Sequence, residues 1–243
     1  MEKHYFYLPH INPGEKFASI TGDEFYHLSK VLRLAKGNVV YLLNGNGLVI
    51  EGKILNKDKN SAAVEIISSF KKPSLNRKII LLQSVIKGER MEVILEKAIE
   101  LGVQEIVPVI TKNCVAKVKS SAKLKRWRKI VIQAMKQSAN PWLAQISEPL
   151  YFKEAIARYS KGAFSKYILT KEGRNLEDFS KKVSHQIVLF VGPEGDFTEQ
   201  EVSGAVASGF SPLNLGSLRL RSETAAIAAL SLFRFAGKQD VSI

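Results

Sequence analysis

The chain has 243 residues, of which 45% are hydrophobic and 24% charged, a composition typical of a soluble globular protein with one large domain or two modest ones. A formal net charge of +13 favours a polyanionic partner, most simply nucleic acid. No apolar run reaches membrane-spanning length and no signal-peptide pattern opens the sequence, so we expect a cytoplasmic protein without membrane contact. A single cysteine, Cys114, excludes an internal disulfide framework, and the four scattered histidines predict no metal site.

Residues 1–70 are predicted to form a small β-rich unit that ends in the polar stretch 69–76. We predict four strands, at 4–8, 37–43, 48–55 and 61–67. The loop 44–47 reads Asn-Gly-Asn-Gly and should close a hairpin between the second and third of them.

A short helix predicted at 23–34 carries His27, Lys30 and Arg33 near its polar side. Each of the three could be an ordinary solvent-facing residue. Together, beside an aromatic strand, they favour contacts with an RNA backbone and a base. In other proteins, a small β-barrel attached to a catalytic domain often delivers RNA to that domain. By analogy, we expect the same role for the N-terminal unit.

From residue 77 onward, strands and helices alternate. A buried strand at 79–85, an amphipathic helix at 89–101 and a strand at 104–109 form one βαβ unit, which predicts a parallel sheet. Further strands are predicted at 167–170, 187–191 and 212–215, each followed by a helix. The fold class is therefore α/β, with a second domain over 77–243.

The stretch 106–147 contains nine basic residues and no acidic one. They are Lys112, Lys117, Lys119, Lys123, Lys125, Arg126, Arg128, Lys129 and Lys136. Such a run is usually a solvated face, but without interspersed carboxylates to neutralise it, this one favours nucleic acid. We expect the helix over 123–138 to contact RNA through Lys125, Arg126 and Lys129.

Two glycine-containing loops lie within 187–229. The first, Gly-Pro-Glu-Gly-Asp-Phe, follows the strand at 187–191 and leads into a helix that a capping box of Thr198 and Glu201 should start and Gly209 should end. The second, Leu-Gly-Ser, follows the strand at 212–215, and we expect Ser222 to cap the helix after it. Parallel strands deliver both loops to one sheet edge, which is where open α/β sheets bind ligands.

Either loop alone would be an ordinary turn, but the pair, with Glu194, Arg221 and Glu223 at its rims, favours a binding site. The first loop lacks the lysine and the Ser/Thr of a phosphate-binding P-loop. No G-x-G-x-x-G motif opens a helix and no nucleophile elbow is present, which argues against a dinucleotide dehydrogenase and a serine hydrolase. Main-chain groups of two loops can instead hold a flat adenine.

Several motifs occur in the order of one known family. They are Gln83–Gly88, Met91-Glu92, Glu96–Gly102, Arg126-Trp127, Gln137-Ser138, Gly192-Pro193-Glu194-Gly195 and Leu215-Gly216 with Leu220–Ala225, preceded by His27 and Val31-Leu32-Arg33. On these residues the chain resembles the ribosomal RNA small subunit methyltransferase E family. The resemblance extends over nearly the whole chain, and the last two motifs together are highly specific.

The resemblance implies an enzyme that uses S-adenosyl-L-methionine (SAM) to methylate N3 of one uridine in 16S ribosomal RNA of the small subunit. It implies an N-terminal PUA-like β-barrel over 1–70, a C-terminal SPOUT domain with a parallel sheet and a deep trefoil knot over 77–243, and a homodimer. Two alternatives stay open: a SPOUT methyltransferase acting on another ribosomal or transfer RNA base, and a non-catalytic RNA-binding protein.

The resemblance and the strand-end positions together imply the site residues. The cofactor-binding residues are expected to be Leu169, Thr170, Val191, Gly192, Pro193, Glu194, Gly195, Leu215, Gly216, Ser217, Leu218, Leu220 and Thr224. The catalytic residues are expected to be Arg221 and Glu223. Arg221 would stabilise the anion that develops on the uracil, or would instead form a structural ion pair with Glu194 or Glu223. Lys87 joins the expected RNA contacts.

The chain departs from the family pattern at three places. Asp196 stands where the family usually has a second glycine. Leu218 stands where an arginine is common, and Arg219 follows it. Ala139-Asn140 replaces a common Gly-Arg pair after Gln137-Ser138.

Overall fold

The structure, a computed structural model, describes residues 3–114, 121–175 and 184–235. The chain divides into two compact units, Met1–Ser74 with Met135–Leu143, and Leu75–Ala134 with Ala144–Ile243. The expected division into 1–70 and 77–243 therefore differs from the structure at the segment 135–143. Main-chain hydrogen bonds give the reason, because Gly47 N donates to Pro141 O and Leu143 N donates to Gly45 O, which fixes this segment to the 44–47 turn.

The N-terminal unit is built on one five-stranded sheet. Its strands are β1 (Tyr5–Tyr7), β2 (Phe17–Thr21), β3 (Val39–Leu43), β4 (Leu48–Lys57) and β5 (Ser61–Lys71), in the order β1-β3-β4-β5-β2. The predicted β3–β4 hairpin is present, with Val39 opposite Lys53. The sheet encloses an apolar core that includes Phe6, Ile20 and Leu28, which are all fully buried. Strand β2 was not predicted from the sequence, and its side chains are mostly exposed.

The helix predicted at 23–34 is two short pieces. An α-helix, α1 (Gly22–Tyr26), runs into a π-helical turn, η1 (His27–Val31), in which Leu32 N donates to His27 O. Arg33 then ends the helical stretch with φ of +53°. π-turns of this kind interrupt helices and are frequent at functional sites.

The C-terminal unit contains a seven-stranded parallel sheet. Its strands are β6 (Lys78–Ser84), β7 (Glu105–Ile110), β8 (Gln145–Ile146), β9 (Leu150–Tyr151), β10 (Ser165–Asn175), β11 (Gln186–Val191) and β12 (Ser211–Asn214). The order is β12-β10-β11-β6-β7-β8, with β9 also paired to β7. The predicted parallel arrangement is therefore confirmed, and β11 and β12 flank β10.

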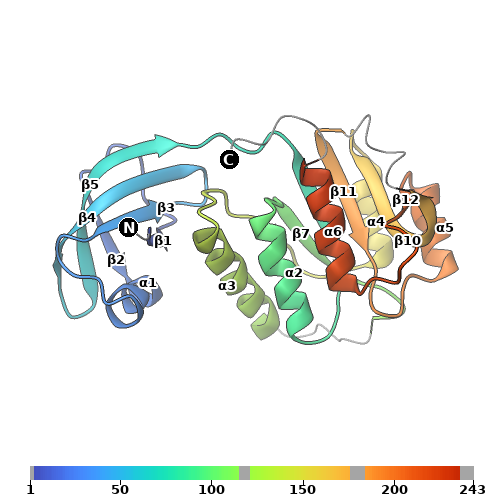
Figure 1. Ribbon diagram of the computed structural model, residues 1–243, viewed down its shortest axis with the longest axis horizontal. Coiled ribbons are helices and arrows are strands. Elements are labelled where there is room, and N and C mark those ends of the chain that lie inside the picture. The colour runs from blue at the N-terminus through green and yellow to red at the C-terminus, as the bar shows by residue number, and fades with distance from the viewer. Residues whose placement is uncertain (1–2, 115–120, 176–183, 236–243) are drawn as a thin grey trace. The chain divides into compact units, whose positions relative to one another are not determined.

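Helices cover both faces of this sheet (Figure 1). They are α2 (Glu89–Glu100), α3 (Ser121–Gln137), α4 (Phe152–Ser160), α5 (Glu199–Ala207) and α6 (Ser222–Phe235). Strand β6 is apolar on both sides, as a doubly covered strand must be. Ile80 and Leu82 pack with side chains of α4 and α5, whereas on the α6 face Tyr167 stacks on Phe233 with ring centroids 4.8 Å apart.

Two elements differ from their predicted form. Strand β10 does not end at Thr170 but continues to Asn175, with a register shift against β12 between Leu169 and Arg174, so no helix follows at 171. Ser222 is the first residue of α6 rather than its cap, because Ala225 N donates to Arg221 O. The hydroxyl of Ser222 is engaged elsewhere, as described below.

The capping box of α5 forms as predicted. Glu201 N donates to the Thr198 hydroxyl, and Thr198 N donates to the Glu201 carboxylate.

In the part of the chain that the structure describes, no helix combines the length and the apolar character needed to cross a bilayer. Among the same residues, no three His, Cys, Asp or Glu side chains gather as metal ligands would.

Candidate functional site

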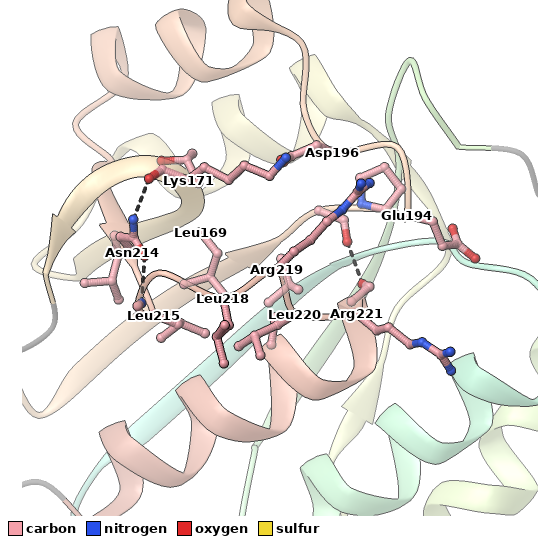
Figure 2. Close-up of a pocket in the computed structure, with 18 of the residues that line it drawn as sticks. Leu169, Lys171, Glu194, Asp196, Asn214, Leu215, Leu218, Arg219, Leu220 and Arg221 are labelled. Carbon is pink, nitrogen blue, oxygen red and sulfur yellow. Dashed lines mark hydrogen bonds between the residues drawn. The ribbon is translucent and has the colours of Figure 1, made fainter.

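A pocket of about 540 Å³ lies at the carboxyl edge of the C-terminal sheet (Figure 2). Its walls come from the end of β10, the loop after β11, the loop after β12 and the first turn of α6. This is the edge at which two glycine-containing loops were predicted to meet. The volume falls in the range of pockets that bind small molecules and cofactors.

The loop after β11 is held in place by hydrogen bonds within its own main chain and to a neighbouring loop. Asp196 N donates to Pro193 O, and Asn113 donates from its side-chain amide to the carbonyls of Gly195 and Asp196, each at 3.0 Å. A Cβ at Gly195 would lie 3.1 Å from the Cβ of Asn113. Gly195 is therefore needed for the close approach of Asn113, which the sequence alone did not indicate.

Asp196 has φ of +63°, a conformation that costs a residue with a side chain about 1 kcal/mol or more. Its Oδ1 accepts a hydrogen bond from Phe197 N at 2.9 Å, which offsets part of that cost. Asp196 thus adopts a left-handed conformation that glycine would adopt without strain, and it adds a carboxylate to the pocket lining.

Asn214 shapes the second loop. Its side-chain carbonyl accepts from Gly216 N at 2.7 Å, and its amide nitrogen donates to Lys171 O, which joins the loop to the extended end of β10. Gly216 has φ of +118°, a conformation that side chains rarely adopt. Sequence reasoning identified Gly216 but missed Asn214 and Lys171, since β10 was expected to end earlier.

Ser222 connects the two loops. Its hydroxyl donates to the carbonyl of Gly192 at 2.6 Å and accepts from the amide of Gln83 at 3.1 Å. Gln83 is fully buried at the end of β6. The start of α6 is therefore tied directly to the loop after β11, so both halves of the pocket form one connected structure.

The pocket lining contains most of the expected cofactor residues. They are Leu169, Thr170, Val191, Gly192, Pro193, Glu194, Leu215, Gly216, Ser217, Leu218 and Leu220. Of the described residues, Gly195 and Thr224 were also expected here but are not part of the lining. Six charged or polar residues that were not among the expected cofactor or catalytic residues also line it, namely Arg90, Lys171, Asp196, Asn214, Arg219 and Ser222.

Arg221 lines the pocket with an exposed side chain, and Figure 2 shows it directed away from the Asp196 side. The expected alternative, an ion pair with Glu194 or Glu223, is not formed: Glu194 pairs with Arg90 at 2.9 Å, and no carboxylate of the described residues lies within ion-pair distance of Arg221. Glu223 is outside the lining, and its buried Oε2 has no hydrogen-bond partner among the described residues.

The basic helix is partly neutralised, contrary to the expectation from its sequence. Arg126 forms a two-pronged ion pair with Glu92 of α2, at 2.7 and 2.8 Å. Arg128 lies 3.4 Å from Glu148. The carboxylates come from other elements, so a charge count along 106–147 could not reveal them. Lys125 and Lys129 are exposed, and Lys117 and Lys119 lie outside the described residues.

In the N-terminal unit, Lys30 and Arg33 are exposed, and His27 is half-buried with its ring 6.3 Å from that of Phe6. Burial, and then the charge of Lys136, lower the pKa of His27. Lys136 itself pairs with Glu24 at 2.7 Å. The lowered pKa favours the neutral imidazole of His27, which can form a hydrogen bond.

Known proteins share this architecture. Residues 73–234 match the model of an RNA methyltransferase domain, and residues 20–67 match an RNA methyltransferase PUA domain. The ribosomal RNA small subunit methyltransferase E of Synechocystis is 32% identical over 221 residues, which span 89% of this chain and 72% of that protein. The chain belongs to the ribosomal RNA small subunit methyltransferase E family.

Solved structures of similar proteins contain the cofactor. The methyltransferase E of Neisseria gonorrhoeae, bound to S-adenosyl methionine, is 32% identical with a TM-score of 0.87, over 96% of this chain and 97% of that one. A Legionella pneumophila protein in complex with bound SAM is 31% identical with a TM-score of 0.89, over 98% and 99%. Both the fold and the family of this chain are thereby established.

Proposed function

We propose that this protein transfers the methyl group of SAM to N3 of a uridine in 16S ribosomal RNA. The observation that carries the proposal is the pocket of about 540 Å³, formed by two loops in a chain of the methyltransferase E family. The relatives with bound SAM support the choice of cofactor. The specific base follows from the resemblance of the motifs, and nucleoside analysis of the methylated RNA tests it directly.

The pocket has features that fit the cofactor. Leu169, Val191 and Leu220 supply apolar lining, and glycines leave main-chain groups accessible to an adenine. The hydroxyl of Thr170 is buried without a hydrogen-bond partner among the described residues, so it can bond to a ligand. We assign cofactor binding to the predicted lining residues and keep Gly195 and Thr224 as supporting residues, since both adjoin the lining in sequence.

Bound SAM would supply a methyl group that its sulfonium has already activated. The task of the protein is then to place N3 of the uracil in line with that group. Loss of the N3 proton to solvent would leave negative charge shared between N3 and the uracil carbonyl oxygens. Transfer of the methyl group from sulfur to N3, with S-adenosyl-L-homocysteine as the other product, would then consume that charge. We assign to Arg221 the stabilisation of this charge, because it lines the pocket and forms no ion pair with the described carboxylates.

Several finer features are part of the same proposal. Glu223 is a second catalytic residue, supported by its unpartnered Oε2 close in sequence to Arg221. His27, Lys30, Arg33, Lys87, Lys125, Arg126 and Lys129 contact RNA. The C-terminal unit carries the SPOUT trefoil knot, the N-terminal sheet is a PUA-like barrel, and the enzyme acts in the cytoplasm. The domains are 1–70 and 77–243, with 135–143 packed against the first.

A homodimer is proposed from apolar side chains that the C-terminal unit exposes. Leu218 is 81% exposed, Phe235 57% and Leu232 42%. Leu232 and Phe235 lie three residues apart on α6 and so share one face of the helix, and neighbouring exposed apolar side chains favour a protein partner. A second copy of the chain is the partner that the family resemblance suggests.

Incubation with isotopically labelled SAM tests the function. We expect label in small-subunit RNA or particles and none in transfer RNA or large-subunit RNA, and nucleoside analysis should identify 3-methyluridine. Label in another nucleoside would contradict the base assignment. Cofactor binding without methylation of any RNA would contradict the enzymatic function.

A further inference from the structure

The mouth of the pocket carries more positive than negative side chains. Its lining contains Arg90, Lys171, Arg219 and Arg221 against two carboxylates, Glu194 and Asp196. Arg90 is paired with Glu194 at 2.9 Å. Lys171, Arg219 and Arg221 form no ion pair with the described residues, and the side chains of all three are exposed.

Lys171 and Arg219 converge on the same side of the pocket (Figure 2). Lys171 extends from β10 toward Asp196, and the side chain of Arg219 extends from the second loop toward the loop that carries Glu194 and Asp196. Asp196 supplies one negative charge on this side of the pocket against the two positive ones, and its Oδ1 also accepts a hydrogen bond from Phe197 N. The two cations are therefore available to a further anionic partner.

The cofactor as a whole does not offset these charges. SAM carries a carboxylate, an ammonium and a sulfonium, so it brings more positive than negative groups into the pocket. With SAM bound, the excess of positive charge at the mouth would be larger than before. RNA phosphates are the anions that remain, and lysine and arginine are the side chains that bind them.

We propose that Lys171 and Arg219 bind the phosphates on either side of the target nucleotide. The proposal rests on the proposed function and assigns to these residues the positioning of the substrate, not the binding of cofactor. By holding the backbone at the pocket mouth, they would direct the unstacked base of the nucleotide toward the transferable methyl group. Arg221 points away from them and keeps its separate assignment.

The test combines Lys171→Gln with Arg219→Gln. We expect the double variant to bind SAM within about twofold of the wild type by calorimetry. Its affinity for a small-subunit RNA fragment should fall about tenfold or more, and the slope of log affinity against log salt should fall by about two, because each substitution removes one cation from a phosphate. The variants Lys171→Arg and Arg219→Lys keep the charge and should recover most of the RNA affinity.

Lys161→Gln is the matched control, because Lys161 is exposed in the same unit and does not line the pocket. Thermal melting of each variant tests whether the fold is retained. A loss of SAM affinity with unchanged RNA affinity would assign the two residues to the cofactor carboxylate and overturn the proposal, as would unchanged affinity for both ligands. If wild-type protein binds RNA but methylates a base other than uridine, the proposed function fails while this inference still stands.

Discussion

At the scale of single residues, Gly216 is the position at which the second loop depends most on the absence of a side chain. Its φ of +118° is unfavourable for other residues, although a Cβ there would meet no atom within 4 Å. The cost of a substitution is therefore one of backbone conformation. The loop path is coupled to the pocket by the hydrogen bond from Gly216 N to Asn214.

We predict that Gly216→Val abolishes SAM binding while the fold persists. The strained loop would shift and displace main-chain groups that line the pocket, but the packing of the core would stay intact. Calorimetry measures the affinity, and circular dichroism the fold. Gly192→Val should also abolish binding but is a less selective test, because its Cβ would lie 3.1 Å from the ring of Phe197. Unchanged affinity in both variants would contradict the site assignment.

Ala139 is strained in the same sense, with φ of +51°. It stands where the family commonly has a glycine, and its main-chain N–H donates to Lys136 O just beyond α3. We predict that Ala139→Gly stabilises the protein by about 0.5–1 kcal/mol, the relief of left-handed strain less the added entropy of the unfolded chain.

The matched control is Ala157→Gly, since Ala157 is exposed inside α4 and has ordinary helical conformation. Glycine there should destabilise by about 1 kcal/mol. Chemical denaturation measures both changes. If Ala139→Gly destabilises the protein as Ala157→Gly does, residue 139 is not strained.

At the scale of elements, α3 shows why a charge run needs its surroundings before it can be interpreted. Arg126 is engaged by Glu92 on α2, so a reversal of its charge would place two carboxylates together and disturb the fold. A selective test of RNA binding should therefore leave Arg126 unchanged and alter Lys125 and Lys129, which are exposed.

We predict that the double variant Lys125→Ala with Lys129→Ala binds RNA more weakly than the wild type. The slope of log affinity against log salt concentration should also become shallower, by up to about one for each phosphate contact removed. SAM affinity should stay the same, because neither residue lines the pocket. Filter binding across a salt series measures this effect. The control pair, Lys153→Ala with Lys161→Ala, removes two exposed lysines near α4. Equal RNA affinity in both pairs would mean that this face of α3 is merely solvated.

Elements with local signals could be predicted from the sequence, and those that depend on distant partners could not. The capping box at Thr198 and the amphipathic stripe of α2, with Met91 and Leu95 buried, are encoded within a few residues and were predicted correctly. The continuation of β10 past Thr170 depends on pairing with β12, and the attachment of 135–143 depends on the 44–47 turn. These contacts join segments that are far apart in the chain, so no local pattern reports them.

The candidate site divides in the same way. Its two glycine loops were visible in the sequence because each follows a buried strand and uses residues suited to tight turns. The contribution of Lys171 to the pocket was not visible in the sequence, because the position of Lys171 depends on how far β10 extends. The role of Ser222 as a connection to Gly192, rather than as a helix cap, depends on a contact between segments 30 residues apart.

At the scale of the whole molecule, each unit has its own core and its own expected task. The N-terminal unit matches a PUA domain model, and the C-terminal unit holds the pocket. The exposed apolar side chains of the C-terminal unit lead to a prediction about assembly. Light scattering should give a mass about twice the 27.0 kDa of one chain.

Replacing Leu232 and Phe235 by Ser should shift the mass toward that of a single chain, because fewer apolar groups would leave water on association. Val206→Ser is the control, as Val206 is similarly exposed on α5. A wild-type mass of one chain at micromolar concentration would contradict the homodimer.

The most direct measurement is the yield of 3-methyluridine in 16S ribosomal RNA after incubation of small-subunit particles with SAM and purified protein. We predict that wild-type protein and Lys161→Gln form this nucleoside, whereas Gly216→Val, although folded, does not. Formation of 3-methyluridine by Gly216→Val at the wild-type rate, or its absence with the wild-type protein, would contradict the conclusion that this pocket is the site of uridine methylation.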